Sequence, residues 1–166
     1  MTYNIIECVW KKNLVFLIAP FRTDRKMLAT YKILKEECAL LGLVLKRSDD
    51  VVGARPILED ITQLIYDAEF IICDLTHERP NVYYELGFAH AAGNQPLDIL
   101  LIAREGTQLH FDIAGYRVRY YRNGSDLRSI VKRDLDAMIE ETRGRRVLGF
   151  KIGGSAAKKV SKRKST

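Results

Sequence analysis

The chain has little of what marks a membrane or secreted protein. No apolar run approaches the length of a membrane span, and Met1 to Asn13 lacks the charged-then-apolar layout of a signal peptide. Only three of the 166 residues are cysteine, and Cys8, Cys38 and Cys73 are scattered in apolar surroundings. Such a set is typical of reduced thiols in a core rather than of a disulfide framework. We therefore expect a cytoplasmic protein with no membrane partner.

Signatures of bound metals and of phosphate loops are also missing. No His, Cys and carboxylate side chains have the spacing of a zinc site, and the chain has neither a Walker loop nor a G-x-G-x-x-G run. No internal repeat is visible. The sequence therefore predicts a function that needs no metal and no cofactor.

Acidic residues are absent from the C-terminal end. From Arg143 to Thr166 the chain carries nine of its 27 Lys and Arg residues and no Asp or Glu, which leaves 18 basic and 21 acidic residues before it. The formal charge of +6 therefore belongs to this end, and the body is mildly acidic. This argues against a nucleic-acid-binding surface on the body. The basic tail is expected to be disordered, and it is either a solvated segment or an arm that binds nucleic acid.

What the sequence does contain is an alternation of strand and helix patterns. Apolar runs typical of buried parallel strands occur at 14–19, 43–46, 70–73 and 97–103, and a more exposed fifth strand is expected at 116–121. Helical patterns follow them at 25–41, 57–68, 81–92 and 126–142. Right-handed crossovers then predict an α/β three-layer sandwich around a five-stranded parallel sheet, with the flavodoxin-like order 2-1-3-4-5.

This pattern divides the chain into three parts. Residues 1–13 are expected to form an N-terminal arm or edge strand, residues 14–142 one α/β domain, and residues 143–166 the basic tail. A domain of this size can bury a core without disulfides or metal. Open α/β sheets bind ligands where the strand order reverses, so we expect a crevice between the first and third strands.

The stretch from Phe70 to Gly93 places two acids near that crevice. The third strand ends at Asp74, and after a polar loop a helix begins near Pro80. Helical spacing puts Asn81 and Glu85 on one side of this helix. As single residues, Asp74 could cap a turn and Glu85 could be a solvated surface group. The neighbours of Glu85 are almost all apolar or small, which favours a cleft that both acids face.

The run from Asp74 to Gly87 has the form D-L-T-x-x-x-P-N-V-x-Y-E-L-G. It resembles the signature of the nucleoside 2-deoxyribosyltransferase-like group and of the related TIR-like nucleotide-binding proteins. The Ala-Pro-Phe triplet that ends at Phe21 and the segment from His110 to Ile113 also resemble elements of this group, which usually has proline in place of His110. The resemblance covers the chain from about Leu14 to Tyr121.

The resemblance implies an enzyme that cleaves or transfers at an N-glycosidic bond, as a hydrolase or a transferase. Glu85 would act at the anomeric carbon of ribose or deoxyribose as nucleophile or charge stabiliser, and Asp74 would bind the substrate. Such chemistry suits a fixed carboxylate, because breaking the bond from C1′ to the base builds positive charge on the sugar. Since Glu85 lies near a helix N-terminus, we expect it to stay ionised.

Further substrate-binding residues are expected in the loops at the carboxyl edge of the sheet, although each could instead only shape or solvate its loop: Pro20, Phe21, Arg22, Ser48, Arg55, Arg79 and Asn81. His77, in the loop after Asp74, is a further candidate. In true deoxyribosyltransferases an aspartate that helps to recognise the base stands at the position of Arg79, and Ser-Gly-Thr stands at residues 80–82.

These departures favour a nucleotide or an NAD-type dinucleotide over a free nucleoside as the partner molecule. Because proteins of this group often complete their sites across subunits, we also expect a homo-oligomer. The alternative function is a non-catalytic module that uses the same crevice to bind or sense a nucleotide.

Overall fold

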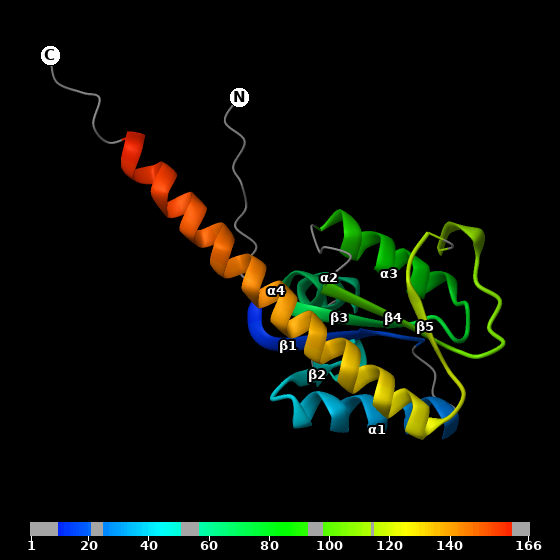
Figure 1. The fold of residues 1–166 in the computed structure, drawn as a ribbon. Helices are drawn as coiled ribbons and strands as arrows, with labels where there is room; N and C mark the ends of the chain where they lie inside the picture. Colours follow the sequence, from blue (N-terminus) through cyan, green and yellow to red (C-terminus); the bar gives the residue numbers. More distant parts are fainter. Residues whose placement is uncertain (1–9, 21–24, 51–56, 93–97, 114, 161–166) are drawn as a thin grey trace, which may run out of the picture.

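The structure is a computed structural model that describes residues 10–20, 25–50, 57–92, 98–113 and 115–160. Its strands and helices alternate along the chain, with two short 3-10 helices, η1 and η3, between them (Figure 1). In chain order the elements are β1 (Lys11–Ile18), α1 (Arg25–Leu40), β2 (Val44–Lys46), η1 (Ser48–Asp50), α2 (Ile57–Asp67), β3 (Ala68–Asp74), α3 (Pro80–Ala91), β4 (Ile99–Arg104), η3 (Phe111–Ile113), β5 (Val118–Tyr121) and α4 (Gly124–Val160).

The strands form one parallel sheet in the order β2-β1-β3-β4-β5. Residues 15–18 of β1 pair with residues 70–73 of β3, and residues 101–104 of β4 pair with residues 118–121 of β5. The predicted α/β class, parallel sheet and strand order are therefore confirmed. The order reverses at β1 and β3, so the carboxyl ends of these two strands flank the expected crevice.

Helices cover both faces of the sheet, as the predicted three-layer sandwich requires (Figure 1). Side chains alternate along the strands: Phe16 and Ile71 pack with the apolar residues of α2 and α3, whereas Val15 and Phe70 pack with those of α1 and α4. All seven residues of β3 are buried. This follows from its central place, because β3 is paired on both edges and covered on both faces.

The amino edge of the sheet buries a charged group that α4 neutralises. Glu69 on β3 accepts hydrogen bonds on both oxygens from the guanidinium of Arg143, each at 3.0 Å. The backbone amide of Asn13 donates a third, at 2.6 Å. Asn13 has a φ of 67°, and the register of β1 shifts between Lys11 and Val15. This irregularity turns the amide of Asn13 toward Glu69, so one carboxylate joins β1, β3 and α4.

Two further acids at this edge also have partners. Asp98, which precedes β4, accepts a 2.7 Å hydrogen bond from the hydroxyl of Thr142 on α4. Asp67, at the end of α2, forms a 2.7 Å ion pair with Lys11 of β1. The middle of α4 is therefore fixed to the sheet by polar contacts as well as by its apolar side chains.

Most predicted elements differ from the structure by one or two residues at their ends, and two elements differ more. β1 begins at Lys11 rather than at Leu14, and α4 continues as a helix to Val160, beyond the predicted end at Thr142. The contact between Arg143 and Glu69 explains why the helix does not end at Thr142, because Arg143 must lie on α4 to reach β3. The division into arm, domain and disordered tail is not tested by these bounds and stays a prediction.

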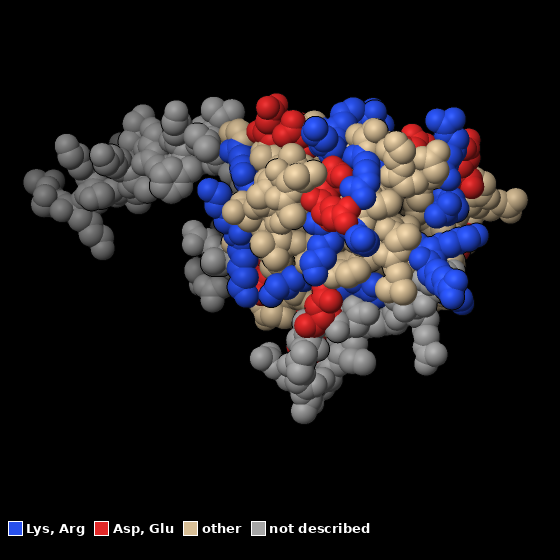
Figure 2. All heavy atoms as spheres, turned by 90° about the horizontal axis from the view of Figure 1, so that it is seen from below, with Lys and Arg blue, Asp and Glu red and all other residues tan. Residues whose placement is uncertain are grey.

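Charges of both signs are mixed on the side of the molecule that carries α1 (Figure 2). Between α1 and α4, Arg128 forms ion pairs with Glu36 and with Glu37, the latter at 2.8 Å.

Binding of nucleic acid through the basic tail stays a prediction. Within the described residues, no helix is both long and apolar enough to cross a membrane.

Candidate active site

Asp74 ends β3 and is only 7% exposed. Its Oδ1 atom accepts two hydrogen bonds from Thr76, one from the hydroxyl at 2.5 Å and one from the backbone amide at 3.0 Å. The Thr76 hydroxyl in turn accepts a 3.0 Å hydrogen bond from the amide of Arg104, at the end of β4. Burial raises the pKa of the Asp74 carboxyl, and the hydrogen bonds from Thr76 oppose this rise.

Asp74 lines a cavity of about 160 Å³ at the carboxyl edge of the sheet. Thr76 and His77 follow it in the loop, Arg104 and Tyr121 reach the cavity from the ends of β4 and β5, and α1 contributes Lys26, Met27 and Thr30. The guanidinium of Arg104 lies over the ring of Tyr121, 5.3 Å from its centroid. The cavity therefore combines one buried carboxylate with several basic groups, which suits a polar ligand such as a sugar or phosphate.

Glu85 lies in the middle of α3, and although it is a charged residue it is only 4% exposed. Asn81, one turn earlier, donates a long 3.5 Å hydrogen bond to its Oε1. The predicted placement of Asn81 and Glu85 on one side of the helix is confirmed by this contact. Among the described residues, Glu85 has no ion pair, so its charge is poorly compensated.

A second cavity, of about 170 Å³, opens beside Glu85 between α2 and α3. Apart from Glu85 and Thr62 its lining is apolar, with Leu58, Ile61 and Ile65 from α2 and Tyr84 and Phe88 from α3. The hydroxyl of Thr62 donates to the carbonyl of Leu58 at 2.7 Å, one turn earlier on the same helix. Glu85 is the one acid in a largely apolar space, with room for a flat ring beside it.

The protonation state of Glu85 differs from the expectation that it stays ionised at the helix N-terminus. Burial raises the pKa of Glu85 to about 7, and the hydrogen bond from Asn81 opposes this rise. The helix dipole stabilises anions mainly within the first turn, by less than about 1 kcal/mol at exposed sites. Glu85 lies deeper, where loss of water outweighs the dipole.

The two acids approach the same thiol, that of Cys73 on β3. Burial raises the pKa of Cys73, and the negative charges of Asp74 and Glu85 raise it further. The cavities that Asp74 and Glu85 line have no residue in common. Asp74 and Glu85 thus lie close to one strand end but line separate cavities, so the described residues do not form the single cleft that the sequence predicted for both acids.

The other predicted binding residues differ in their position and exposure. Pro20 is buried at the end of β1, Ser48 is half-buried in η1, and Asn81 contacts Glu85. Arg79 is exposed and occupies the N-cap position of α3, where its side chain makes no capping hydrogen bond. Phe21, Arg22 and Arg55 lie outside the described residues. The role of all seven in binding stays a prediction.

The loop after β4 lies apart from both carboxylates. The Nδ1 atom of His110 lies 3.0 Å from a carboxylate oxygen of Asp112, and Phe111 is 76% exposed. The ring of Tyr83 packs against His110 with centroids 6.4 Å apart, and Tyr84 lines the cavity of Glu85. Of the two tyrosines beside Glu85 in sequence, only Tyr84 shares its cavity.

Several residues of the Asp74 cavity were not predicted from the sequence. Thr76, Arg104 and Tyr121 lie at or just after the ends of β3, β4 and β5. The carboxyl ends of parallel strands meet at one edge of a sheet, so the last residue of each predicted strand was the available signal. In the described part of the chain, no group of three or more His, Cys, Asp and Glu side chains could hold a metal ion.

Comparison with solved structures supports the fold. The structure of BcmB, a CMP N-glycosidase of Clostridium botulinum, matches with a TM-score of 0.55 and 18% sequence identity, over 70% of this chain and 96% of that chain. This chain therefore shares the fold of that structure. No protein-family model and no curated protein sequence matches the chain.

The predicted resemblance to the nucleoside 2-deoxyribosyltransferase-like group is therefore confirmed for the fold. At 18% identity the likeness does not assign roles to residues. In this fold, Asp74 ends the strand next to the reversal of strand order and Glu85 lies on the helix that follows.

Proposed function

We propose that the protein cleaves or transfers at the N-glycosidic bond of a nucleotide, with Glu85 acting at the anomeric carbon. The observation that carries this proposal is a buried carboxylate with one long hydrogen bond and no ion pair among the described residues, beside a ring-sized apolar cavity. A buried acid without a cation costs stability, so a purely structural role would not explain it. The fold shared with a CMP N-glycosidase adds support.

The chemistry follows from the two carboxylates. Ionised Glu85 attacks C1′ or stabilises its positive charge, the bond from C1′ to nitrogen breaks, and the base leaves with the electron pair and takes up a proton. In the covalent route, water or a second base then attacks C1′, loses its proton, and releases the Glu85 carboxylate. In this proposal the substrate spans the two cavities: Asp74 accepts hydrogen bonds from ribose hydroxyls in one, and so fixes the sugar relative to Glu85 at the edge of the other.

The polar cavity favours a phosphorylated substrate over a free nucleoside. Lys26, His77 and Arg104 face the same space as Asp74, so a phosphate near the sugar would meet positive charge. A nucleoside monophosphate and an NAD-type dinucleotide both satisfy this requirement.

A non-catalytic nucleotide sensor is the second candidate. With a pKa of about 7, a share of Glu85 is neutral near neutral pH and can donate a hydrogen bond to a bound ring. Such a protein would hold a nucleotide without breaking it.

A homo-oligomer is also proposed. Leu58 and Tyr84, at the rim of the Glu85 cavity, are 56% and 64% exposed, and a second copy could cover them. Light scattering over a range of protein concentrations tests this proposal, and a monomer at all of them would contradict it.

Incubation of the protein with pooled nucleosides, nucleotides and NAD, followed by mass spectrometry of free bases, tests the proposed function. We expect one class of nucleotide to release its base, and Glu85→Gln to reduce release by about 1,000-fold or more. Glu140→Gln, an exposed acid of α4, is the matched control. Binding in calorimetry without any released base would favour the sensor, and unchanged release by Glu85→Gln would exclude Glu85 as the catalytic group.

A further inference from the structure

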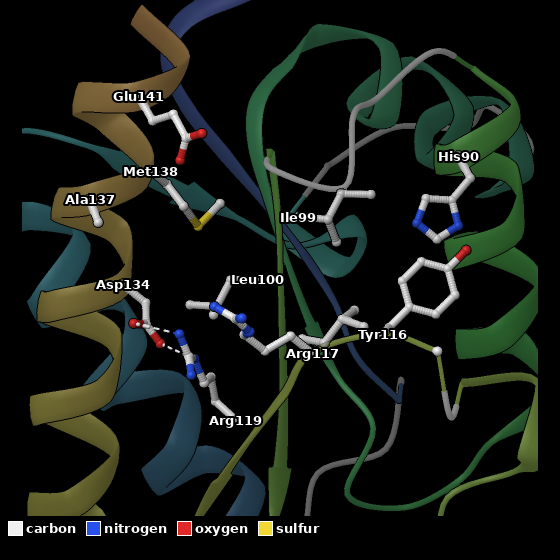
Figure 3. Close-up of a pocket in the computed structure, with 12 residues that line it drawn as sticks. His90, Ile99, Leu100, Tyr116, Arg117, Arg119, Asp134, Ala137, Met138 and Glu141 are labelled. Carbon is white, nitrogen blue, oxygen red and sulfur yellow. Dashed lines mark hydrogen bonds and ion pairs between the residues drawn. The ribbon is translucent and has the colours of Figure 1, made fainter.

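A hollow of about 460 Å³ lies over the amino-terminal half of β4, and none of its lining residues belongs to the cavities of Asp74 and Glu85 (Figure 3). It exists because β5 pairs with β4 only from Leu101 onward. In the described part of the chain, Ile99 and Leu100 therefore have no strand beside them on this side. The hollow is walled by α4, by residues 115–117 and by His90 at the end of α3. Its volume is within the usual range of small-molecule sites.

One wall offers an aromatic surface. The rings of His90 and Tyr116 are stacked, with centroids 5.0 Å apart and an angle of 9° between their planes. Tyr116 is 40% exposed, so part of this pair is open to the hollow. Met138 on α4 and Leu100 on β4 add apolar surface from the opposite wall and the floor (Figure 3). A flat ring would find apolar contacts on several sides.

At the end of the hollow near Asp134, two arginines of the lining, Arg117 and Arg119, face one acid. Asp134 is bound by two guanidinium groups: Arg119 contacts it at 2.6 and 3.2 Å, and Arg133 at 3.0 and 3.2 Å. Arg117 has no ion pair within the described residues, and its side chain extends toward the Arg119–Asp134 pair (Figure 3). Two guanidinium groups, those of Arg117 and Arg119, thus line the hollow beside one carboxylate, which Arg119 and Arg133 already bind.

The other acid of the hollow does not cancel this charge. Glu141 lies two turns beyond Asp134 on α4, about 10 Å along the helix axis. Its carboxylate is exposed and, among the described residues, forms no ion pair. It can accept hydrogen bonds from a ligand at the far end of the hollow, while the end with Arg117 and Arg119 is suited to an anion.

We propose that this hollow is a second ligand site, which binds a small organic anion with a flat ring, of the kind that a nucleoside monophosphate presents. The anionic group lies between Arg117 and Arg119, and the ring lies between Tyr116 and Met138. The proposal does not rest on the proposed function, because it uses neither Glu85 nor Asp74.

The three histidines of the chain allow binding to each site to be observed separately. His90 lines the hollow, His77 lines the cavity of Asp74, and His110 lies in the loop after β4. The imidazole carbon-bound proton signals of the full chain are recorded by NMR while adenosine, cytidine, guanosine or uridine 5′-monophosphate is added. The Glu85→Gln protein is used throughout, so that the nucleotide is not consumed.

We expect at least one monophosphate to shift the His90 signal in a saturable manner, with the matching nucleoside binding about tenfold more weakly or worse because it lacks the anion. Arg117→Met should weaken binding by about tenfold or more, since it removes a charged donor to the phosphate. Lys132→Met, which removes one charge from an exposed position of α4 outside the hollow, should leave the affinity unchanged. Tyr116→Ala should weaken the binding of monophosphate and nucleoside alike, because it removes the side chain that contacts the ring of the ligand.

Other outcomes would overturn the proposal. One is a shift of the His77 signal without a shift of the His90 signal. Another is an affinity for the monophosphate that Arg117→Met leaves unchanged. A third is a His90 signal that responds to protein concentration but to no monophosphate, which would mean that a second copy fills the hollow. Base release by the wild-type protein is measured separately, so failure of the proposed function leaves this test intact.

Discussion

Glu69 and Glu85 are both buried glutamates, but their surroundings differ. Glu69, at the amino edge of the sheet, accepts two 3.0 Å hydrogen bonds from Arg143 and one of 2.6 Å from the backbone of Asn13. Glu85 has Asn81 at 3.5 Å and, among the described residues, no cation. A buried carboxylate with a full set of hydrogen bonds holds elements together. A buried carboxylate with few partners costs free energy in the folded protein, and a ligand that supplies the missing partners reduces this cost. The comparison therefore favours a structural role for Glu69 and supports the proposed catalytic role of Glu85.

The largest expected effect on stability is at the amino edge. Arg143→Met leaves Glu69 buried without its guanidinium, and we expect the free energy of unfolding to fall by about 3 kcal/mol, since removing one partner strands the other charge. Urea unfolding measures this change. Lys132→Met, at an exposed position of the same helix, is the control. A loss no larger than that of the control would mean that Glu69 does not need Arg143.

Glu85→Gln should raise the free energy of unfolding, whereas Arg143→Met lowers it. The pKa of Glu85 is raised from its ordinary value of 4.5 to about 7, so its contribution to stability is fully present below pH 4.5 and is lost as pH rises through 7. A neutral glutamine avoids this loss. We expect the free energy of unfolding above pH 7 to increase by about 1 to 3 kcal/mol. Urea unfolding across this pH range provides the measurement, and a variant that is less stable at high pH would contradict the assigned environment.

Two threonines allow a matched test of the comparison. Thr76 donates its hydroxyl to Asp74 at the carboxyl edge, and Thr142 donates its hydroxyl to Asp98 at the amino edge. Thr142→Val should lower the free energy of unfolding by about 1 kcal/mol and leave turnover per folded molecule unchanged. Thr76→Val should reduce kcat/KM for base release by about tenfold, because it loosens Asp74. Equal effects of both variants on turnover would remove the distinction between the two edges.

The smallest effect concerns the pH dependence of base release. Because the nucleophile must be ionised, kcat/KM should rise with pH through about 7, the pKa of Glu85. The hydrogen bond from Asn81 lowers this pKa, so Asn81→Ala should move the rising limb to higher pH, by up to about half a unit. Thr62→Val changes the same cavity without touching Glu85 and should leave the limb in place. A limb that moves to lower pH in Asn81→Ala would refute the assignment.

Much of the fold could be predicted because apolar runs mark buried strands directly. The run Phe70 to Cys73 gave the central strand, and its end at Asp74 gave the position of the first acid. The apolar neighbours of Glu85 in sequence correctly indicated burial. The same burial raises the pKa of Glu85 to about 7, against the expectation that it stays ionised, because the cost of losing water depends on how α2 covers α3.

Contacts between distant segments could not be predicted in this way. Arg104 and Tyr121 reach Asp74 only because β4 and β5 follow β3 in the sheet. Arg143 contacts Glu69 across 74 positions of sequence, and a basic residue at the start of a basic run gave no sign of this contact. Such pairs depend on the complete packing of α4 against the sheet rather than on any local pattern.

The link between Arg143 and Glu69 also bears on the order in which the protein assembles. During synthesis β1 and β3 leave the ribosome long before the arginine that neutralises their shared carboxylate. Until then we expect Glu69 to keep its water, because burying the carboxylate without its cation would cost free energy. We therefore expect α4, which is synthesised after the whole sheet, to be the helix that lets this edge of the sheet lose its water.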